Sequence, residues 1–324
     1  MQSNLKALDV KWDDEARASQ TIVDKIGYAL ALAATAIWAG NFVVARGIHE
    51  AIPPAALAFW RWAVATVALA PFALRPTIAA WPVIRRHWRY LTVTALVGVT
   101  LFNTLIYVAG HTTEAINLSL IAASSPVFVI LLARFLYGDL ITPPKAIGTV
   151  VALGGVTLLI TAGSLDRLLR LTFAIGDLWM LLAALAFAGY STLVKHKPEA
   201  MDTRVFLMST FTLGVLFLIP LYWGERRLGY VIHLTPVTTL AVLYVGIGAS
   251  LVAFFAWNEA IVRIGPSRAA LMYYLVPVFS GVASSLILGE PVGVVHVLSM
   301  ALIVSGIAVA TRAGASQRAC ASGG

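Results

Sequence analysis

Ten long apolar runs fill the chain between residues 26 and 311 and leave only short polar stretches between them. A helix needs about 20 apolar residues to cross a bilayer, and backbone amides cannot go unpaired in lipid. The runs therefore predict an all-α membrane protein with ten transmembrane helices. The predicted spans are 26–45, 55–74, 90–109, 115–137, 145–162, 174–194, 203–223, 238–262, 267–288 and 292–311.

The composition excludes an ordinary soluble enzyme. Of the 324 residues, 60% are hydrophobic and 12% are charged, whereas soluble domains carry about 25% charged residues. The net charge of +8 would suggest nucleic-acid binding in a soluble protein, but here the basic residues are scattered between apolar runs. In a membrane protein such residues set the orientation. The expected environment is a lipid bilayer, and nucleic acid is not an expected partner.

Lysine and arginine favour one orientation of the spans. If residues 1–25 are cytoplasmic, sixteen of these cations fall on the cytoplasmic side and five on the opposite side. Short loops rich in Lys and Arg stay in the cytoplasm. We therefore expect two cytoplasmic tails, residues 1–25 and 312–324, on a multi-pass protein of the bacterial inner membrane. The first tail mixes acidic and basic residues, unlike a secretory signal.

The two halves of the chain repeat one another. A shift of 151 positions aligns several short motifs without a gap, and a slightly different shift pairs Gly27 with Gly176. The aligned motifs are Pro126-Val127-Phe128 with Pro277-Val278-Phe279, Gly138-Asp139 with Gly289-Glu290, and Gly155 with Gly306. The predicted units are residues 26–162 and 163–311, with five helices each. Because five is odd, the second unit must enter the membrane from the opposite side, an arrangement typical of alternating-access transporters.

These motifs are where the chain resembles a known family. The Pro-Val-Phe triplets, the Gly followed by Asp139 or Glu290, and the glycines of the fifth and tenth spans resemble the drug/metabolite transporter superfamily, in its ten-helix branch of paired EamA-type units. The likeness covers residues 26–311. Within that branch the chain looks most like bacterial aromatic amino-acid exporters, on its head and on the stretches 38–42 and 124–126. Asp139 stands where family members often have Glu.

The resemblance implies a fold and an activity. Helices 1–4 and 6–9 would surround a central cavity, and helices 5 and 10 would brace the outside. The expected activity is export of aromatic and other neutral amino acids by alternating access, without ATP. Nucleosides, cationic compounds and sugar derivatives remain alternative cargoes in the same superfamily.

A transported amino acid brings two charges that need polar partners inside the membrane. Candidates are aromatic and polar side chains within the spans, some at helical spacing, such as Thr100, Asn103 and Tyr107. The predicted substrate-binding residues are Trp38, Asn41, Phe42, Thr100, Asn103, Tyr107, Ser124, Ser125, Phe187, Tyr190, Phe254, Asn258, Tyr273 and Tyr274. Each aromatic could instead pack against neighbouring helices, and the polar residues of the third span could form hydrogen bonds between helices.

Proline and charge mark further positions within the spans. Pro126 and Pro277 are candidate hinges, because a mid-span proline frees a carbonyl and permits a kink; a static packing role is the alternative. Arg61 could snorkel outward or hold a substrate carboxylate. Lys195 is expected to be an interface anchor. Glu259 and His111 are fallback proton sites if transport is coupled, although no carboxylate is expected at a midplane.

Several classes of chemistry lack their motifs. There is no phosphate-binding Gly loop followed by Lys-Ser or Lys-Thr, and no His-Glu-x-x-His pattern. Cys320 stands alone in the tail, so neither a disulfide framework nor a Cys-based metal site is expected. We expect no cofactor and no metal, and an intramembrane enzyme is the rival hypothesis. The oligomeric state is left open, with a monomer plausible.

Overall fold

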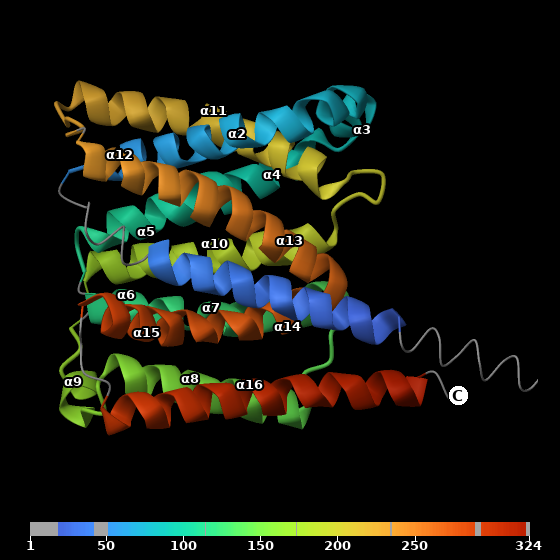
Figure 1. The fold of residues 1–324 in the computed structure, drawn as a ribbon, viewed down its shortest axis with the longest axis vertical. Helices are drawn as coiled ribbons and strands as arrows, with labels where there is room; N and C mark the ends of the chain where they lie inside the picture. Colours follow the sequence, from blue (N-terminus) through green and yellow to red (C-terminus); the bar gives the residue numbers. More distant parts are fainter. Residues whose placement is uncertain are drawn as a thin grey trace, which may run out of the picture.

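The protein is an all-helical bundle whose helices run roughly side by side (Figure 1). The structure is a computed structural model that describes residues 19–41, 51–113, 115–172, 174–233, 235–288 and 293–321, and no β-strand occurs within these ranges. The first helix is Ser19–Asn41. It is followed by α2 (Pro54–Ala79), α3 (Trp81–Arg86), α4 (Trp88–Ala95), η1 (Leu96–Leu101), α5 (Phe102–Gly110), α6 (Ala115–Ala122), α7 (Ser125–Tyr137), α8 (Pro143–Ile160) and α9 (Leu165–Leu169). The second half contains α10 (Ile175–Lys195), α11 (Thr203–Arg227), α12 (Pro236–Leu243), η2 (Tyr244–Val252), α13 (Ala253–Ile264), α14 (Pro266–Met272), η3 (Tyr273–Leu275), α15 (Val276–Leu288) and α16 (Val294–Ala321).

The ten predicted spans correspond to helical segments throughout the described part of the chain. Nine helical stretches there are long and apolar enough to cross a membrane. The predicted span 267–288 is built by α14, η3 and α15, which follow one another without a gap. Three boundaries lie clearly beyond the sequence prediction: the first helix begins at Ser19, α2 continues to Ala79, and α16 continues to Ala321. An apolar run indicates only the part of a helix that lies in lipid, and the helix can continue into water beyond that part.

The connections between spans use residues that start and stop helices. Proline opens α2, α8, α12 and α14, at Pro54, Pro143, Pro236 and Pro266. At this position the ring supplies the helical φ and the missing N–H has no helical partner to lose. Gly265 separates α13 from α14 with a φ of 80°, a conformation that L side chains rarely adopt. Short connections of this kind make successive helices antiparallel neighbours.

Equivalent glycines make equivalent contacts in the two repeats. Gly27, in the first helix, lies against Arg263 and Ile264 at the end of α13. Gly176, in α10, lies against Thr112 and Thr113, just after α5. The 151-residue shift pairs Thr112 and Thr113 with Arg263 and Ile264, and the slightly different shift pairs the two glycines. The predicted all-α architecture of two inverted five-helix repeats is therefore confirmed in its contacts as well as in its sequence.

Helices α8 and α16 lie together at one edge of the bundle, and α2 and α11 lie together at the opposite edge (Figure 1). A Cβ atom on Gly148 would overlap the backbone of Gly306 and Ala310, and one on Gly306 would overlap the backbone of Ala152. Glycine thus permits the close packing of α8 on α16 that small residues provide in membranes.

The start of the first helix and the end of α16 lie at the same face of the bundle, which we call the terminal face (Figure 1). The starts of α2 and α10 and the end of α11 lie at the other face, the distal face. Four spans are interrupted between these faces. The third and eighth spans contain the π-helical segments η1 and η2. The fourth span is interrupted at Ala123 and Ser124, before Pro126, and the ninth changes to the 3-10 segment η3 before Pro277; we call these two places breaks.

Candidate functional site

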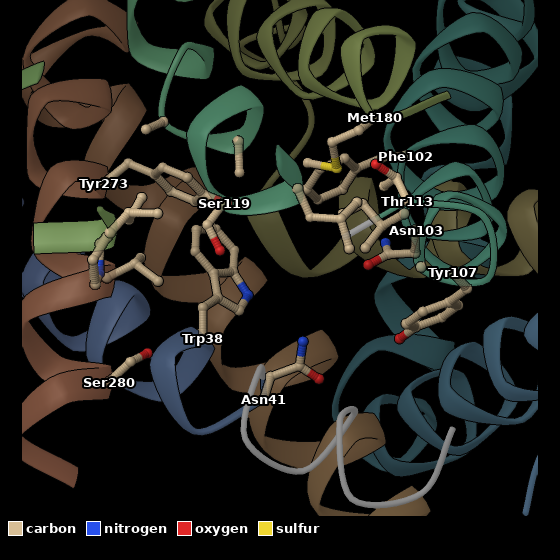
Figure 2. A pocket seen from close by; sticks show the side chains of 18 of the residues that line it. Trp38, Asn41, Phe102, Asn103, Tyr107, Thr113, Ser119, Met180, Tyr273 and Ser280 are labelled. Atoms are coloured by element: carbon tan, nitrogen blue, oxygen red, sulfur yellow. The ribbon is translucent and has the colours of Figure 1, made fainter. Parts of the chain in front are cut away.

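A cavity of about 610 Å³ lies within the bundle and reaches toward the distal face (Figure 2). Its wall comes mainly from the first helix, α2, α5, α6, α8 and the η3–α15 segment, with one residue each from α10 and α13. The resemblance implied that helices 5 and 10 stay outside the cavity, but Val156, Leu159 and Ile160 of α8, the fifth span, line it. Helix α11 contributes no lining residue.

The distal halves of the fourth and ninth spans lie on either side of the cavity, and we call the space between them its mouth. Leu118 and Ala122 of α6 line one side, and Val276 and Ser280 line the other on α15. At the terminal face, in contrast, α14 packs directly on α7. The two broken spans are thus separated on one side of their prolines and in contact on the other.

An aromatic cluster forms the deep end of the cavity around Trp38. Its ring lies 5.7 Å from Phe254, 5.8 Å from Phe187 and 6.0 Å from Tyr273, measured between centroids and in edge-to-face geometry. Its indole N–H donates a hydrogen bond of 2.9 Å to the carbonyl of Ala249. Edge-to-face contacts of this kind stabilise aromatic pairs beyond their burial. Trp38 is therefore held rigidly, with part of its surface facing the cavity.

Arg61 lies in the same wall and does not snorkel. Its side chain is buried, at 1% exposure, about two turns from the start of α2. The guanidinium donates from Nε to Ser250 Oγ at 2.8 Å, and from Nη1 to Asn103 Oδ1 at 2.8 Å and to Tyr107 OH at 2.6 Å. It also lies over the Trp62 ring, 5.3 Å from the centroid. All four partners are neutral, so its charge is hydrogen-bonded but not compensated.

Three polar atoms of cavity-lining residues have no hydrogen-bond partner among the described residues. They are Asn41 Oδ1, Asn103 Nδ2 and the Tyr274 hydroxyl. A buried polar group without a partner is costly, and such groups are rare in folded proteins. In a cavity wall they are available to a polar solute, as acceptor, donor and hydroxyl respectively.

Eight of the predicted residues, including one candidate hinge, line this cavity. They are Trp38, Asn41, Asn103, Tyr107, Phe254, Tyr273, Tyr274 and Pro277. Seven others lie outside its wall: Thr100, Ser124, Ser125, Phe187, Tyr190, Asn258 and the candidate hinge Pro126. Phe42 falls outside the described residues.

The residues outside the wall are engaged in packing. Asn258 Nδ2 donates to the Tyr190 hydroxyl at 2.7 Å, and both residues are buried. Thr100 donates across the bundle to the carbonyl of Gly214 at 3.4 Å. Ser124 bonds the Ile121 carbonyl at 2.6 Å. These side chains are hydrogen-bonded to other protein groups and lie outside the cavity wall.

Charged and polar contacts join four elements at the terminal face. Asp139, after α7, accepts from Ser267 of α14 at 3.1 Å and lies 3.6 Å from Lys195 of α10. Arg268 of α14 pairs with Asp24 of the first helix at 3.2 Å. These contacts hold the start of the ninth span against the ends of the fourth and sixth spans.

The remaining charged candidates lie away from the deep end of the cavity. Glu259 accepts hydrogen bonds from Thr203 and Arg263 at the terminal end of α13. Lys195 pairs with Asp139, and its ammonium lies over the Tyr137 ring. His111 lines the cavity at its distal end. Within the described ranges, no Asp or Glu lines the cavity and no three His, Cys, Asp or Glu residues are placed to hold a metal ion.

Sequence reasoning missed part of the wall. Ile106, Met180, Thr113 and Ser280 line the cavity but were not singled out. Ile106 follows Asn103 at helical spacing and could have been found from the same face. Met180 and Ser280 come from other spans. The periodicity of one helix does not show which residues of other helices lie opposite it.

Comparisons with known proteins agree with this architecture. The sequence model of the EamA-like transporter family matches the chain twice, over residues 25–161 and 174–312. An uncharacterized transporter from Archaeoglobus fulgidus is 29% identical over 85% of this chain and 93% of its own length. A probable terminal-alkyne amino-acid exporter from Streptantibioticus cattleyicolor is 28% identical over 85% of this chain and 90% of its own. A protein of known crystal structure is similar in fold, with a TM-score of 0.70 at 21% identity, covering 90% of this chain and 96% of that one.

Proposed function

Because the chain belongs to the EamA-like transporter family, we propose that it exports aromatic and other large neutral amino acids across the bacterial inner membrane by alternating access. The observation that carries the proposal is the cavity, which reaches one face of the bundle while the other face is closed by α7 and α14. Its volume of about 610 Å³ lies within the range of small-molecule pockets. The wall is mostly apolar and aromatic, with a few polar atoms, as an amphipathic solute requires.

The terminal face is assigned to the cytoplasm, and with it both chain ends. Lys and Arg are concentrated in the loops and tails of that side. On this assignment the structure is the outward-facing state. Asp139, Lys195 and Ser267 then belong to the contacts that close the cytoplasmic side.

The inverted repeat supplies the second state. By the repeat shifts, Trp38, Asn41, Asn103 and Tyr107 of the cavity wall correspond to Phe187, Tyr190, Phe254 and Asn258. The Tyr190–Asn258 hydrogen bond lies in the closed half of the molecule. In the inward-facing state this half would open and the outer halves of the fourth and ninth spans would meet, with motion at the breaks before Pro126 and Pro277.

The cycle needs no nucleotide. Proton-driven transporters commonly relay protons through intramembrane Asp, Glu or His. The described cavity wall contains no carboxylate, and its one histidine, His111, lies at the distal end; we therefore propose facilitated, gradient-driven movement, with His111 as the fallback proton site. The amino-acid part of the proposal is supported by the similar protein named as a probable exporter of a terminal-alkyne amino acid. Export of another solute of the same superfamily is the alternative, and a chemically altered product would indicate an enzyme.

The test is solute counterflow into liposomes that contain the purified protein. Labelled phenylalanine or tryptophan should accumulate transiently in liposomes preloaded with the unlabelled amino acid, and it should be recovered unchanged by mass spectrometry. Trp38→Ala should reduce the rate at least tenfold, because it removes the anchor of the aromatic cluster. Trp81→Ala, at an exposed tryptophan of α3, should leave it unchanged. Failure of the wild type to move either amino acid would refute the proposed cargo, and competition with nucleosides and cationic compounds would identify the alternative.

A further inference from the structure

Arg61 carries a full charge inside the bundle without an ionic partner. Other arginines of the described residues do form ion pairs, for example Arg263 with Glu259 and Arg268 with Asp24. Within the described residues no carboxylate lies within 4.0 Å of the Arg61 guanidinium. Its charge is therefore met only by neutral oxygens of Ser250, Asn103 and Tyr107. Burial of an uncompensated charge is expensive, so this arrangement calls for an anion.

The guanidinium has donors left for such an anion. Hydrogen bonds occupy Nε and Nη1, and no bond from Nη2 to a described residue is present. Nη2 carries two N–H groups, and Arg offers five in a planar fork that matches a carboxylate. Arg61, Asn103 and Tyr107 all line the cavity. In Figure 2, Asn103 and Tyr107 lie on the same side of the cavity, across from Tyr273.

The second repeat has no counterpart of the cluster formed by Arg61, Ser250, Asn103 and Tyr107. Helices α2 and α11 start at Pro54 and Thr203, which places Thr210 at the position equivalent to Arg61. Thr210 bonds the carbonyl of Phe206 within its own helix. By the 151-residue shift, Ser250 corresponds to Val99. A device needed by the duplicated scaffold would occur in both copies, so Arg61 and its partners serve something that the cavity holds.

We infer that Arg61 binds the carboxylate of the transported solute and makes an anionic group a requirement of the cargo. The inference rests on the proposed function and names the group by which the cavity selects. Ser250, Asn103 and Tyr107 are positioning residues that hold the guanidinium toward the cavity. The free Asn41 Oδ1 and Tyr274 hydroxyl are acceptors available to an ammonium group of the same solute. The site therefore suits a zwitterionic amino acid and disfavours an amine without an acid group.

The first arm of the test changes the solute and leaves the protein intact. Wild-type protein in liposomes is offered labelled phenylalanine in competition with phenethylamine, phenylalanine amide and 3-phenylpropionate. The two compounds without a carboxylate should compete at least tenfold more weakly than phenylalanine, whereas 3-phenylpropionate, which keeps the carboxylate, should compete better than either. Equal competition by phenethylamine would overturn the inference.

The second arm changes the arginine. Arg61→Gln should raise the apparent KM for phenylalanine about 10- to 100-fold, the loss expected for a charge-assisted hydrogen bond. Arg61→Lys, which keeps the charge without the fork, should fall between it and the wild type. Arg134→Gln is the matched control, because Arg134 lies exposed on α7. Binding of phenylalanine to the purified variants, followed by thermal shift, separates a lost anchor from a lost fold.

The two arms separate this inference from the proposed function. If the wild type carries phenylalanine but Arg61→Gln keeps its KM and still binds phenylalanine, the export proposal stands and the anchor is refuted. If the wild type carries no amino acid but binds other small carboxylates in an Arg61-dependent way, the anchor stands and the proposed cargo is wrong. If sugar phosphates bind through Arg61 and carboxylates do not, the carboxylate assignment is overturned.

Discussion

Single residues distinguish the half of the interior that contains the cavity from the half that is packed. Asn103 and Tyr107 line the cavity, and their oxygens accept hydrogen bonds from Arg61. Of their counterparts, Phe254 packs against Tyr190 at the edge of the cavity, and Asn258 donates to the Tyr190 hydroxyl outside the cavity wall. The same type of position thus carries different chemistry in the two copies. On the proposed function, individual side chains of the cavity wall would select the substrate, while the repeated scaffold is common to both halves.

Tyr107 is the residue where this division can be tested with least damage to the fold. Tyr107→Phe removes the 2.6 Å hydrogen bond from Arg61 and leaves the ring in place. We expect the apparent KM for a carboxylate-bearing solute to rise about tenfold, or about 1.4 kcal/mol, with little change in thermal stability. Tyr222→Phe is the control, since Tyr222 stacks on Phe59 away from the cavity. An unchanged KM in Tyr107→Phe would mean that the Arg61 cluster does not position a solute.

At this scale the sequence predicted the kinds of residue better than their places. Asn103 and Tyr107 lie on the cavity face of their helix, as their spacing indicated. Thr100 belongs to the same stripe yet bonds Gly214, because the third span contains the π-helical segment η1, which changes the phase of the stripe. For Arg61 the sequence left two roles open. Helical periodicity predicts which face of its helix a side chain occupies, but not how deeply the neighbouring helices bury it.

At the scale of elements, small residues and helix ends decide how the spans meet. Glu225 of α11 accepts from the backbone N–H groups of Ala55 and Ala56, both at 2.8 Å, and so caps the start of α2. A carboxylate at a helix N-terminus also complements the helix dipole. The cap fixes the helix that carries Arg61, two turns further along.

Loss of this cap should be measurable. Glu225→Gln should lower the free energy of unfolding by about 1 kcal/mol and reduce the thermal stability of the purified protein. The physical reason is that the amide is a weaker acceptor for the N–H groups of Ala55 and Ala56, which have no acceptor within the first turn of α2. Glu199→Gln, in the loop before α11, should have no such effect. Equal stability of both variants would show that Glu225 does not cap α2.

The contact between α8 and α16 gives a second test at this scale. Gly148→Val should destabilise the protein by about 2–3 kcal/mol, because its side chain would meet the backbone of Gly306 and Ala310. Gly154→Val lies in the same helix, where a Cβ meets nothing within 4 Å. Thermal unfolding in detergent should separate the two variants. Similar melting of both would contradict the close packing of this pair.

Elements were predictable where the bilayer dictates them. A run such as 55–74 must be a helix in lipid, so the sequence predicted α2 and its fellow spans. The breaks were less accessible: Pro126 and Pro277 indicated two of them, but no residue signals the π-helical segments η1 and η2. Those segments occur at overlapping positions of the two repeats, so they are features of the duplicated unit. Their register depends on packing, as in the close approach of Gly98 to the Tyr190 ring.

At the scale of the molecule, symmetry explains why half of the predicted binding residues are packed. An inverted repeat offers two related cavities, one for each face, and alternating access requires one of them to be closed. In the proposed cycle, the buried residues Phe187, Tyr190 and Asn258 would belong to the closed one. The sequence predicted both sets, because it carries both copies, but it could not indicate which was open.

Distances between spin labels in membrane nanodiscs test this alternation most directly. In a Cys320→Ser background, one label pair at Leu120 of α6 and Val282 of α15 spans the cavity mouth. A second pair, at Leu136 of α7 and Val262 of α13, spans the closed face. On addition of transported amino acid we predict a population with a shorter distance across the mouth and a longer distance across the closed face. Transport with both distances unchanged, or with both lengthening together, would contradict the account.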